Sequence, residues 1–446
     1  MPQATQRLNP LLMKISDSAT TRLDRALAAI EAAGDEGRRI FTRVYADAAR
    51  EAAVAADARA SRGISLGPLD GRIVSIKDLF DVAGEPTTAG SVLLRQAPPA
   101  TVDAPVVQRL RAGGAVIIGK TNMTEFAFSG IGLNPHYGTP GNAVDGTRIP
   151  GGSSSGAGVS VARGMAEIAI GSDTGGSVRI PSALNGLAGF KPTQARVPRD
   201  GAFPLSFTFD TLGPLARNVL DCARADAVLA AQPFTPLAPR AVRGLRAGVP
   251  RGLLFTQMEV AVSNAIEAAL QTLARAGAQV DDVALDEWLS APFRLQERGT
   301  MIGAEASYIH HTLMAEHAAA YDPMVLSRLR RSGTLDGAGY VGVQQARAAL
   351  LPALDAQLAG LDVLLLPTVP ITAPSMAALA DEAAFGQANN LVLRNPSVFN
   401  FYDLPAVSLP LPVAPGALPV GLMVVGRRGG DAVLLSLAAA LEAVLH

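Results

Sequence analysis

The sequence has little of several features that mark particular protein classes. It holds one cysteine, Cys222, among 446 residues, so no internal disulfide can form and no thiolate cluster is available. Its 38 basic and 39 acidic side chains give a net charge of −1, which offers nothing specific to nucleic acid or an anionic membrane. It also lacks a signal-peptide pattern and any apolar run of about 18 residues. We therefore expect a cytoplasmic protein that acts on a small molecule.

The motifs that hold catalytic metals are missing as well. The sequence contains no H-E-x-x-H motif and no spaced set of cysteines and histidines. His310, His311 and His317 share one helical-looking stretch, but their spacing does not place all three imidazoles on one helical face. We therefore expect no metal site, and no residue pattern calls for an organic cofactor.

What is present predicts an α/β protein. Apolar residues make up 49% of the chain, which is enough for a large buried core. Alanine-rich amphipathic stretches predict helices at 22–33 and 40–60. Helix–turn–strand units follow at 106–121 and 262–283, and residues 232–250 are the best linker candidate. Alternation of this kind indicates a sheet covered by helices on both faces.

Two clusters of glycine and serine carry the chemistry. Ser153 lies in the first and Ser177 in the second, 24 residues later (177 − 153). The paired glycines before Ser177 allow successive N–H groups to point into one concavity, as an oxyanion requires. Lys77 lies in an otherwise apolar strand, where burial would lower its pKa and make it a base. The alternatives are a phosphate-binding nest at the glycines and a buried ion pair of Lys77 with Asp78 or Asp81.

Five segments, in order, resemble the amidase signature family. They are SIKDLFDVAGEPTTAGS, GGAVIIGKTNMTEFAF, PGGSSSGAGVSVARG, GSDTGGSVRIPSALNGLAGFKPT and LPAVSLPLPVAPGALPVGLMVVG. The similarity runs from about residue 66 to the C-terminus and is densest between 67 and 215. The resemblance implies one large domain, 1–446, around a mixed, mainly parallel twisted sheet with helices on both faces. Its expected parts are an N-terminal helical cover (1–65), the signature core (66–231), a linker and helix-rich flank (232–360) and a return to the sheet (361–446).

Aligned position by position, the resemblance implies a Ser–Ser–Lys catalytic set. Ser177 falls on the nucleophile, Ser153 on the bridging serine that usually follows a cis peptide bond, and Lys77 on the base. In the implied mechanism neutral Lys77 accepts a proton through Ser153 as Ser177 attacks, an acyl-enzyme forms, and water releases the acid. The implied reaction hydrolyses a small carboxamide, or a ureido or aryl amide, to an acid and ammonia or an amine. The implied oxyanion-hole amides are those of Thr174, Gly175, Gly176 and Ser177.

The sequence leaves the choice of substrate open but suggests residues for its pocket. Arg179 has two candidate roles, binding a substrate carboxylate or bracing its loop by pairing with Asp173, and we favour the second. Asp403 stands where the family commonly carries glycine, which would change the shape or charge of the pocket. The candidate substrate-binding residues are Phe128, Ser129, Tyr137, Arg179 and Asp403.

Two other interpretations stay open. Residues 152–156, GSSSG, match the G-x-S-x-G elbow of α/β-hydrolases with Ser154 as nucleophile, but that mechanism needs a downstream histidine, and those present are better explained by packing. The glutaminase chain of a tRNA-dependent amidotransferase belongs to the same family. Such chains typically continue the TNM element as DEFAMGSSTE, whereas this one has TEFAFSGIG, which favours a free-standing amidase. We expect a small amide as partner, neither nucleic acid nor membrane, and leave a homodimer open.

Overall fold

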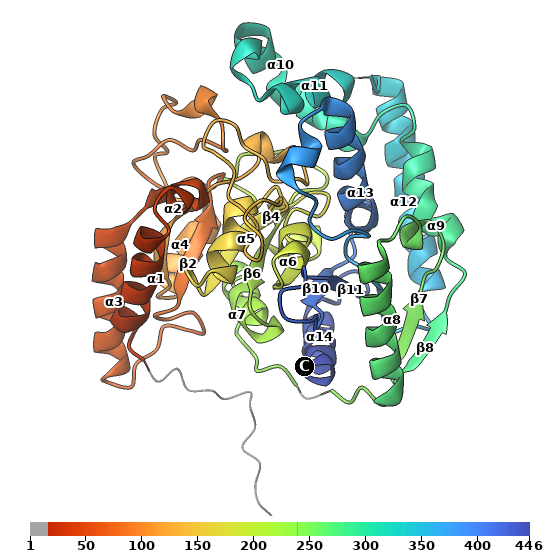
Figure 1. Ribbon diagram of the computed structural model, residues 1–446, viewed down its shortest axis with the longest axis horizontal. Coiled ribbons are helices and arrows are strands. Elements are labelled where there is room, and N and C mark those ends of the chain that lie inside the picture. Colours follow the sequence, from red (N-terminus) through yellow and green to blue (C-terminus); the bar gives the residue numbers. More distant parts are fainter. Residues whose placement is uncertain (1–16, 239, 333) are drawn as a thin grey trace, which may run out of the picture.

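One continuous sheet organises the fold (Figure 1). The computed structural model describes residues 17–446 except residues 239 and 333, and the described part contains an 11-stranded sheet. The strands follow one another across the sheet as β1 (Phe41–Val44), β3 (Val116–Thr121), β2 (Ile73–Lys77), β4 (Ile168–Asp173), β6 (Thr211–Ala216), β5 (Ala188–Lys191), β10 (Ala406–Pro410), β11 (Gly421–Val425), β9 (Val363–Pro367), β7 (Arg246–Val249) and β8 (Gln279–Asp282).

The sheet is mixed, as expected, but the expectation that it is mainly parallel is wrong. Among the strands that the structure describes, four neighbouring pairs are parallel, namely β2–β3, β2–β4, β7–β8 and β7–β9. The other six pairs are antiparallel and occupy the centre and one edge. The centre is antiparallel because β5 connects to β6, and β10 to β11, without a crossover helix.

Helices cover both faces of the sheet, and alternate strand residues enter different cores. Val74 and Ile76 belong to the core beneath one set of helices, whereas Ile73 belongs to a core on the opposite face. The first set comprises α4 (Pro105–Ala112), α7 (Val219–Leu229), α8 (Val260–Arg275) and α14 (Asp431–Leu445). The opposite face carries α1 (Ala19–Ala32), α3 (Ala46–Ala60), α5 (Ser155–Ala162), α6 (Arg179–Leu184), α9 (Asp286–Leu295), α12 (Gly337–Gln357) and α13 (Glu382–Phe401). Helices α10 (Met301–His317) and α11 (Pro323–Ser332) lie together at the top of Figure 1.

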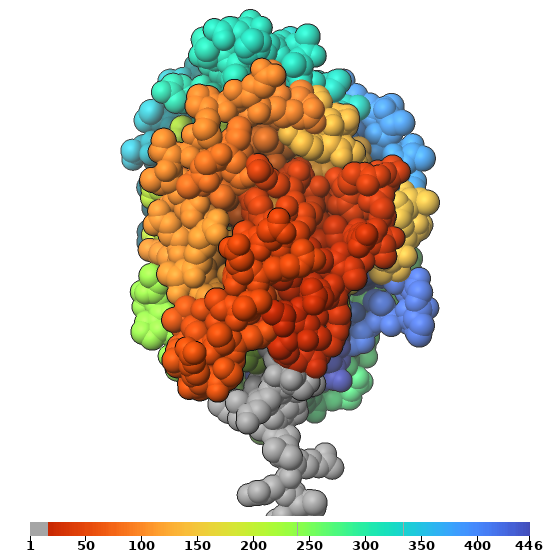
Figure 2. All heavy atoms as spheres, turned by 90° about the vertical axis from the view of Figure 1, so that its left-hand side faces the viewer, coloured from red at the N-terminus to blue at the C-terminus, as the bar shows by residue number. Residues whose placement is uncertain are grey.

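The N-terminal segment covers one end of the sheet, the side that faces the viewer in Figure 2. Helices α1 and α3 pack against each other, and α3 packs on β3. The prediction of one helix over 40–60 is wrong, because α2 (Asp35–Ile40) ends at Ile40 and residues 41–44 form the edge strand β1. The sequence FTRV is rich in aromatic and β-branched residues, which favour a strand. The helical cover therefore includes one strand.

The linker candidate at 232–250 also contributes to the sheet. Its last residues form β7, which pairs with β8 and β9 in parallel. The segment therefore crosses from α7 to the far edge of the same sheet. None of the described helices is long and apolar enough to span a bilayer.

Candidate active site

Lys77 ends strand β2 and is completely buried. Its Nζ donates hydrogen bonds to Ser153 Oγ at 2.7 Å and to Ser172 Oγ at 2.8 Å. Ser172 lies on β4, which pairs with β2 in parallel, so the carboxyl ends of both strands reach the same edge of the sheet. Ser172 was missed in the sequence, although it directly precedes the acid of the second glycine–serine cluster.

Burial makes Lys77 a candidate base. The expected alternative, an ion pair with a neighbouring acid, is not formed: Asp78 lies 3.6 Å from Lys120, and Asp81 accepts a hydrogen bond from Thr87. Burial lowers the pKa of Lys77 from 10.5 to about 7, although the charges of two more distant carboxylates act in the opposite direction. A substantial share of Lys77 is therefore an uncharged amine at neutral pH.

Ser153 stands in a narrow turn before α5 and is also fully buried. The peptide bond between Gly152 and Ser153 is cis, as the resemblance implies. A side chain at position 152 would place Cβ 2.7 Å from the backbone nitrogen of Gly132, so only glycine fits there. The turn aims the Ser153 hydroxyl at Lys77.

Ser177 lies at the edge of a cavity of about 930 Å³, just before α6. A backbone hydrogen bond from Ser154 N to Ser177 O, 3.3 Å long, joins the two glycine–serine clusters. The Ser177 hydroxyl has no hydrogen-bond partner in the part of the chain that the structure describes. Thr174 and Gly175 line the same cavity. The nucleophile candidate therefore faces the space that a substrate would fill, next to the loop that holds Ser153.

One of the four candidate oxyanion donors in the glycine turn before Ser177 already has a partner. The Gly176 amide donates to Asp173 Oδ1 at 2.8 Å. The amides of Thr174, Gly175 and Ser177 have no partner among the described residues, and all three residues line the cavity. Gly176 has φ +132°, and a Cβ there would lie 2.7 Å from Ile180 and Pro396.

Arg179 does not face the cavity, and its assignment to substrate binding is corrected. Its Nε and one terminal nitrogen donate to Asp173 at 3.0 and 2.9 Å, and that nitrogen also reaches Asn400 Oδ1 at 2.6 Å. Both charged groups are fully buried. Burial raises the pKa of Asp173, but the charge and hydrogen bonds of Arg179 outweigh this and hold the pKa well below its usual range. The pair braces the turn that presents Ser177, the role favoured from the sequence.

The remaining pocket candidates divide into two groups. Phe128 and Ser129 line the cavity together with Ser177. Tyr137 and Asp403 are not among the described residues that line this cavity. The Tyr137 hydroxyl accepts a hydrogen bond from Arg95, and Asp403, with φ +52°, accepts one from the Gln194 backbone after α13 ends.

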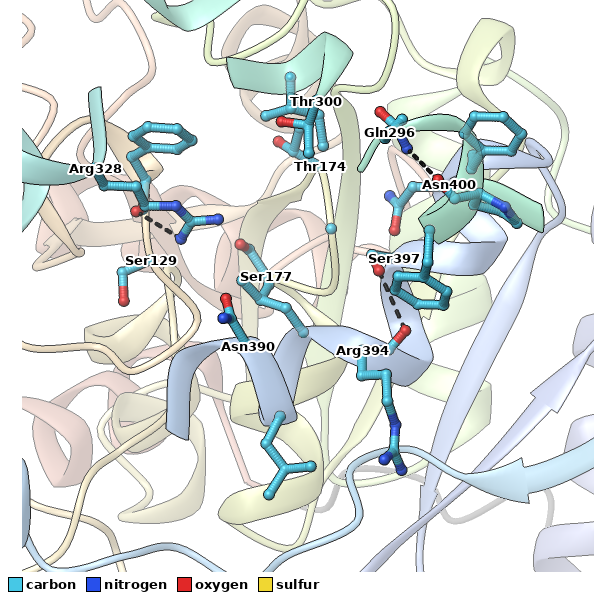
Figure 3. Close-up of a pocket in the computed structure, with 18 of the residues that line it drawn as sticks. Ser129, Thr174, Ser177, Gln296, Thr300, Arg328, Asn390, Arg394, Ser397 and Asn400 are labelled. Atoms are coloured by element: carbon cyan, nitrogen blue, oxygen red, sulfur yellow. Dashed lines mark hydrogen bonds between the residues drawn. The ribbon is translucent and has the colours of Figure 1, made fainter. Parts of the chain in front are cut away.

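Most of the cavity wall comes from segments that carry no recognisable motif. Helix α13 contributes one side, and residues of α9, α10 and α11 contribute another. In Figure 3, Arg328 and Ser129 lie on one side of Ser177, with Arg394 and Ser397 on the other. Apart from Ser129, these residues lie more than 100 positions from Ser177 in the sequence. No local sequence pattern therefore predicts that they lie beside Ser177.

The structure gives no support to the elbow interpretation. Ser154 is fully buried and its Oγ donates to the backbone oxygen of Ser172 at 3.4 Å. His310 is buried next to Tyr321, with 3.0 Å between its Nδ1 and the phenol oxygen. Within the described residues, no group of three His, Cys, Asp or Glu side chains is arranged to hold a metal ion.

Comparison with known proteins identifies the family. The amidase family model matches residues 23–435. The chain is 38% identical to 2-amino-5-chloromuconic acid deaminase of Comamonas testosteroni, covering 89% of this chain and 86% of the deaminase. It is 37% identical to the A chain of the glutamyl-tRNA(Gln) amidotransferase of Anaeromyxobacter dehalogenans (strain 2CP-C), covering 95% of this chain and 92% of that one. A crystal structure of an amidase superposes with a TM-score of 0.86 at 35% identity, covering 96% of this chain and 97% of the other.

The chain belongs to the amidase family. Its fold, a single α/β domain with a large mixed sheet flanked by helices, is that of amidase signature enzymes. It is accordingly an amidohydrolase, a hydrolase acting on C–N bonds.

Proposed function

We propose that Ser177, Ser153 and Lys77 hydrolyse a small amide through an acyl-enzyme. Ser177 Oγ attacks the amide carbon, and its proton passes through Ser153 to uncharged Lys77. The same relay returns the proton to the departing nitrogen, so ammonia or an amine leaves and Ser177 keeps the acyl group. Water then gives a proton to Lys77 through the same relay and attacks the acyl carbon. As the bond between the acyl carbon and Ser177 Oγ breaks, the relay returns this proton to Ser177 and the acid leaves.

One observation carries this proposal: the 2.7 Å hydrogen bond from Lys77 Nζ to Ser153 Oγ, made where burial brings the pKa of Lys77 to about 7. A base of this pKa can accept and return a proton near neutral pH. Thr174, Gly175 and Ser177 line the cavity, and their amides, which have no partner among the described residues, are the proposed donors for the developing oxyanion. Each well-placed donor of this kind is worth about 3 kcal/mol in the transition state.

Serine variants test the assignment. We expect Ser177→Ala to lower kcat for a simple carboxamide by about 10⁴-fold or more, because no other group in the site would form the acyl bond. Mass spectrometry of wild type mixed with a slowly released ester should detect one acyl group on Ser177. Ser154→Ala is the matched control, since Ser154 belongs to the same cluster but does not contact Lys77. Unchanged activity in Ser177→Ala, or a collapse in Ser154→Ala alone, would contradict the proposal.

A second candidate function rests on the similarity to the amidotransferase chain. In that case the same site would release ammonia from glutamine for a partner chain. The purified chain alone should then hydrolyse simple amides poorly, and partner chains should stimulate glutamine hydrolysis. Full activity of the isolated chain on small amides would exclude this candidate. A cytoplasmic location and a homodimer stay predictions from the sequence.

A further inference from the structure

The cavity beside Ser177 is lined by positive but not by negative side chains. Among the described residues that line it, the charged ones are Arg328 and Arg394. Neither forms an ion pair with an acid in the described part of the chain, and burial lowers the pKa of both, in Arg328 to about 10. Arg394 is buried and Arg328 is half-buried, and a cation that has lost part of its hydration is stabilised by a nearby counter-charge. The walls therefore favour an anionic occupant.

The hydrogen bonds of Arg394 are already made within the protein. Its Nε donates to Asn395 Oδ1 at 3.0 Å, and one terminal nitrogen donates to Thr256 Oγ1 at 3.0 Å. The other terminal nitrogen reaches the backbone oxygens of Thr256 and Leu254. In Figure 3 its guanidinium points away from Ser177. Arg394 therefore ties α13 to the segment around residue 255 and has few donors left for a ligand.

Arg328 keeps most of its donors. One terminal nitrogen donates to the backbone oxygen of Phe128 at 3.1 Å, and the guanidinium lies 4.4 Å from the centre of the Phe128 ring. Its Nε and second terminal nitrogen have no partner among the described residues. In Figure 3 its side chain extends from α11 toward Ser177, above Ser129. The aromatic ring and the carbonyl oxygen fix the plane of the guanidinium while leaving one edge open.

We propose that the substrate is a small amide that also carries a carboxylate, and that Arg328 binds this carboxylate. The inference rests on the proposed function, because it places the amide carbon at Ser177. A planar guanidinium with two open donors matches the two oxygens of a carboxylate. The other polar groups on the wall, such as Gln296 and Asn390, are neutral and suit a singly charged ligand better than a phosphate. Arg328 thus takes the role that the sequence had offered to Arg179.

Paired substrates test the proposal. The probes are monoamides of dicarboxylic acids of increasing length, each compared with the alkyl amide in which methyl replaces the carboxylate. We expect wild type to have the lower KM for monoamides. Arg328→Met should raise that KM by about 10- to 100-fold and change KM for the alkyl amides by less than about twofold. Arg330→Met is the matched control, because Arg330 is an exposed residue of the same helix.

The outcomes separate this inference from the proposed function. If wild type has the same KM for alkyl amides and for monoamides, or if Arg328→Met raises both KM values to the same extent, the carboxylate site is refuted while the acyl-enzyme stands. If hydrolysis survives in Ser177→Ala, the proposed function fails instead. Calorimetric binding of the monoamides to the Ser177→Ala protein gives a test that needs no turnover. In the Ser177→Ala background, Arg328→Lys should retain part of the affinity for the monoamides that Arg328→Met loses. Equal affinity in the Ser177→Ala protein and in its two Arg328 variants would overturn the proposal.

Discussion

The buried amine of Lys77 should leave a measurable signature in the stability of the protein. Its pKa is about 7 in the folded chain, against an ordinary value of 10.5. Between these two pH values the unfolded chain holds the proton and the folded chain does not, so unfolding takes up a proton. Raising the pH therefore disfavours unfolding. The contribution of Lys77 to the unfolding free energy should grow by about 1.4 kcal/mol per pH unit across this window.

Lys77→Met isolates this contribution, because the same other groups titrate in both proteins. We expect the difference in unfolding free energy between wild type and variant to change by about 2.5 kcal/mol from pH 7.5 to pH 9.5, in favour of wild type. Equilibrium urea denaturation at three pH values in this range measures it. The kcat/KM of wild type should fall with decreasing pH, with a half-maximal value near pH 7. A difference in unfolding free energy that stays constant across pH would refute the claim that Lys77 is uncharged.

Two further substitutions test the surroundings of this amine. Ser172→Ala removes one of the two hydroxyls that are hydrogen-bonded to Lys77, so kcat/KM should fall by about tenfold. Ser172→Thr should recover most of this loss. Full activity of the alanine variant would show that the contact is dispensable. Arg179→Met leaves the carboxylate of Asp173 buried without its cation, so the unfolding free energy measured in urea should drop by about 3–5 kcal/mol. A loss below about 1 kcal/mol would contradict the role of the Arg179–Asp173 pair.

The proximity of the three proposed catalytic residues could be predicted because they lie in motifs that neighbouring strands bring together. Ser153 and Ser177 flank one strand, and Lys77 ends the neighbouring strand. The hydrogen bonds within the glycine turn before Ser177 could not be predicted from the sequence. From the sequence, all four amides of the glycine turn were equal candidates, and only the position of Asp173 shows that the Gly176 amide is already bound.

The cavity wall could not be predicted, for a physical reason. Arg328 reaches the site from α11, and its availability depends on which carboxylates lie near it in space. Arg179, close to Ser177 in the sequence, was the better local candidate, yet the fold encloses it with Asp173. The edge strand β1 was hidden in the same way, because four residues between two helices give too short a pattern to detect.

The division of the site between two parts of the chain separates reaction from recognition. The proposed base, relay and nucleophile all come from residues 77–177, whereas α9, α10, α11 and α13 close the cavity from residues beyond 285. Changes in those helices can reshape the cavity without touching the hydrogen bond between Lys77 and Ser153. The same chemical reaction can therefore be kept while the substrate that fits the cavity changes.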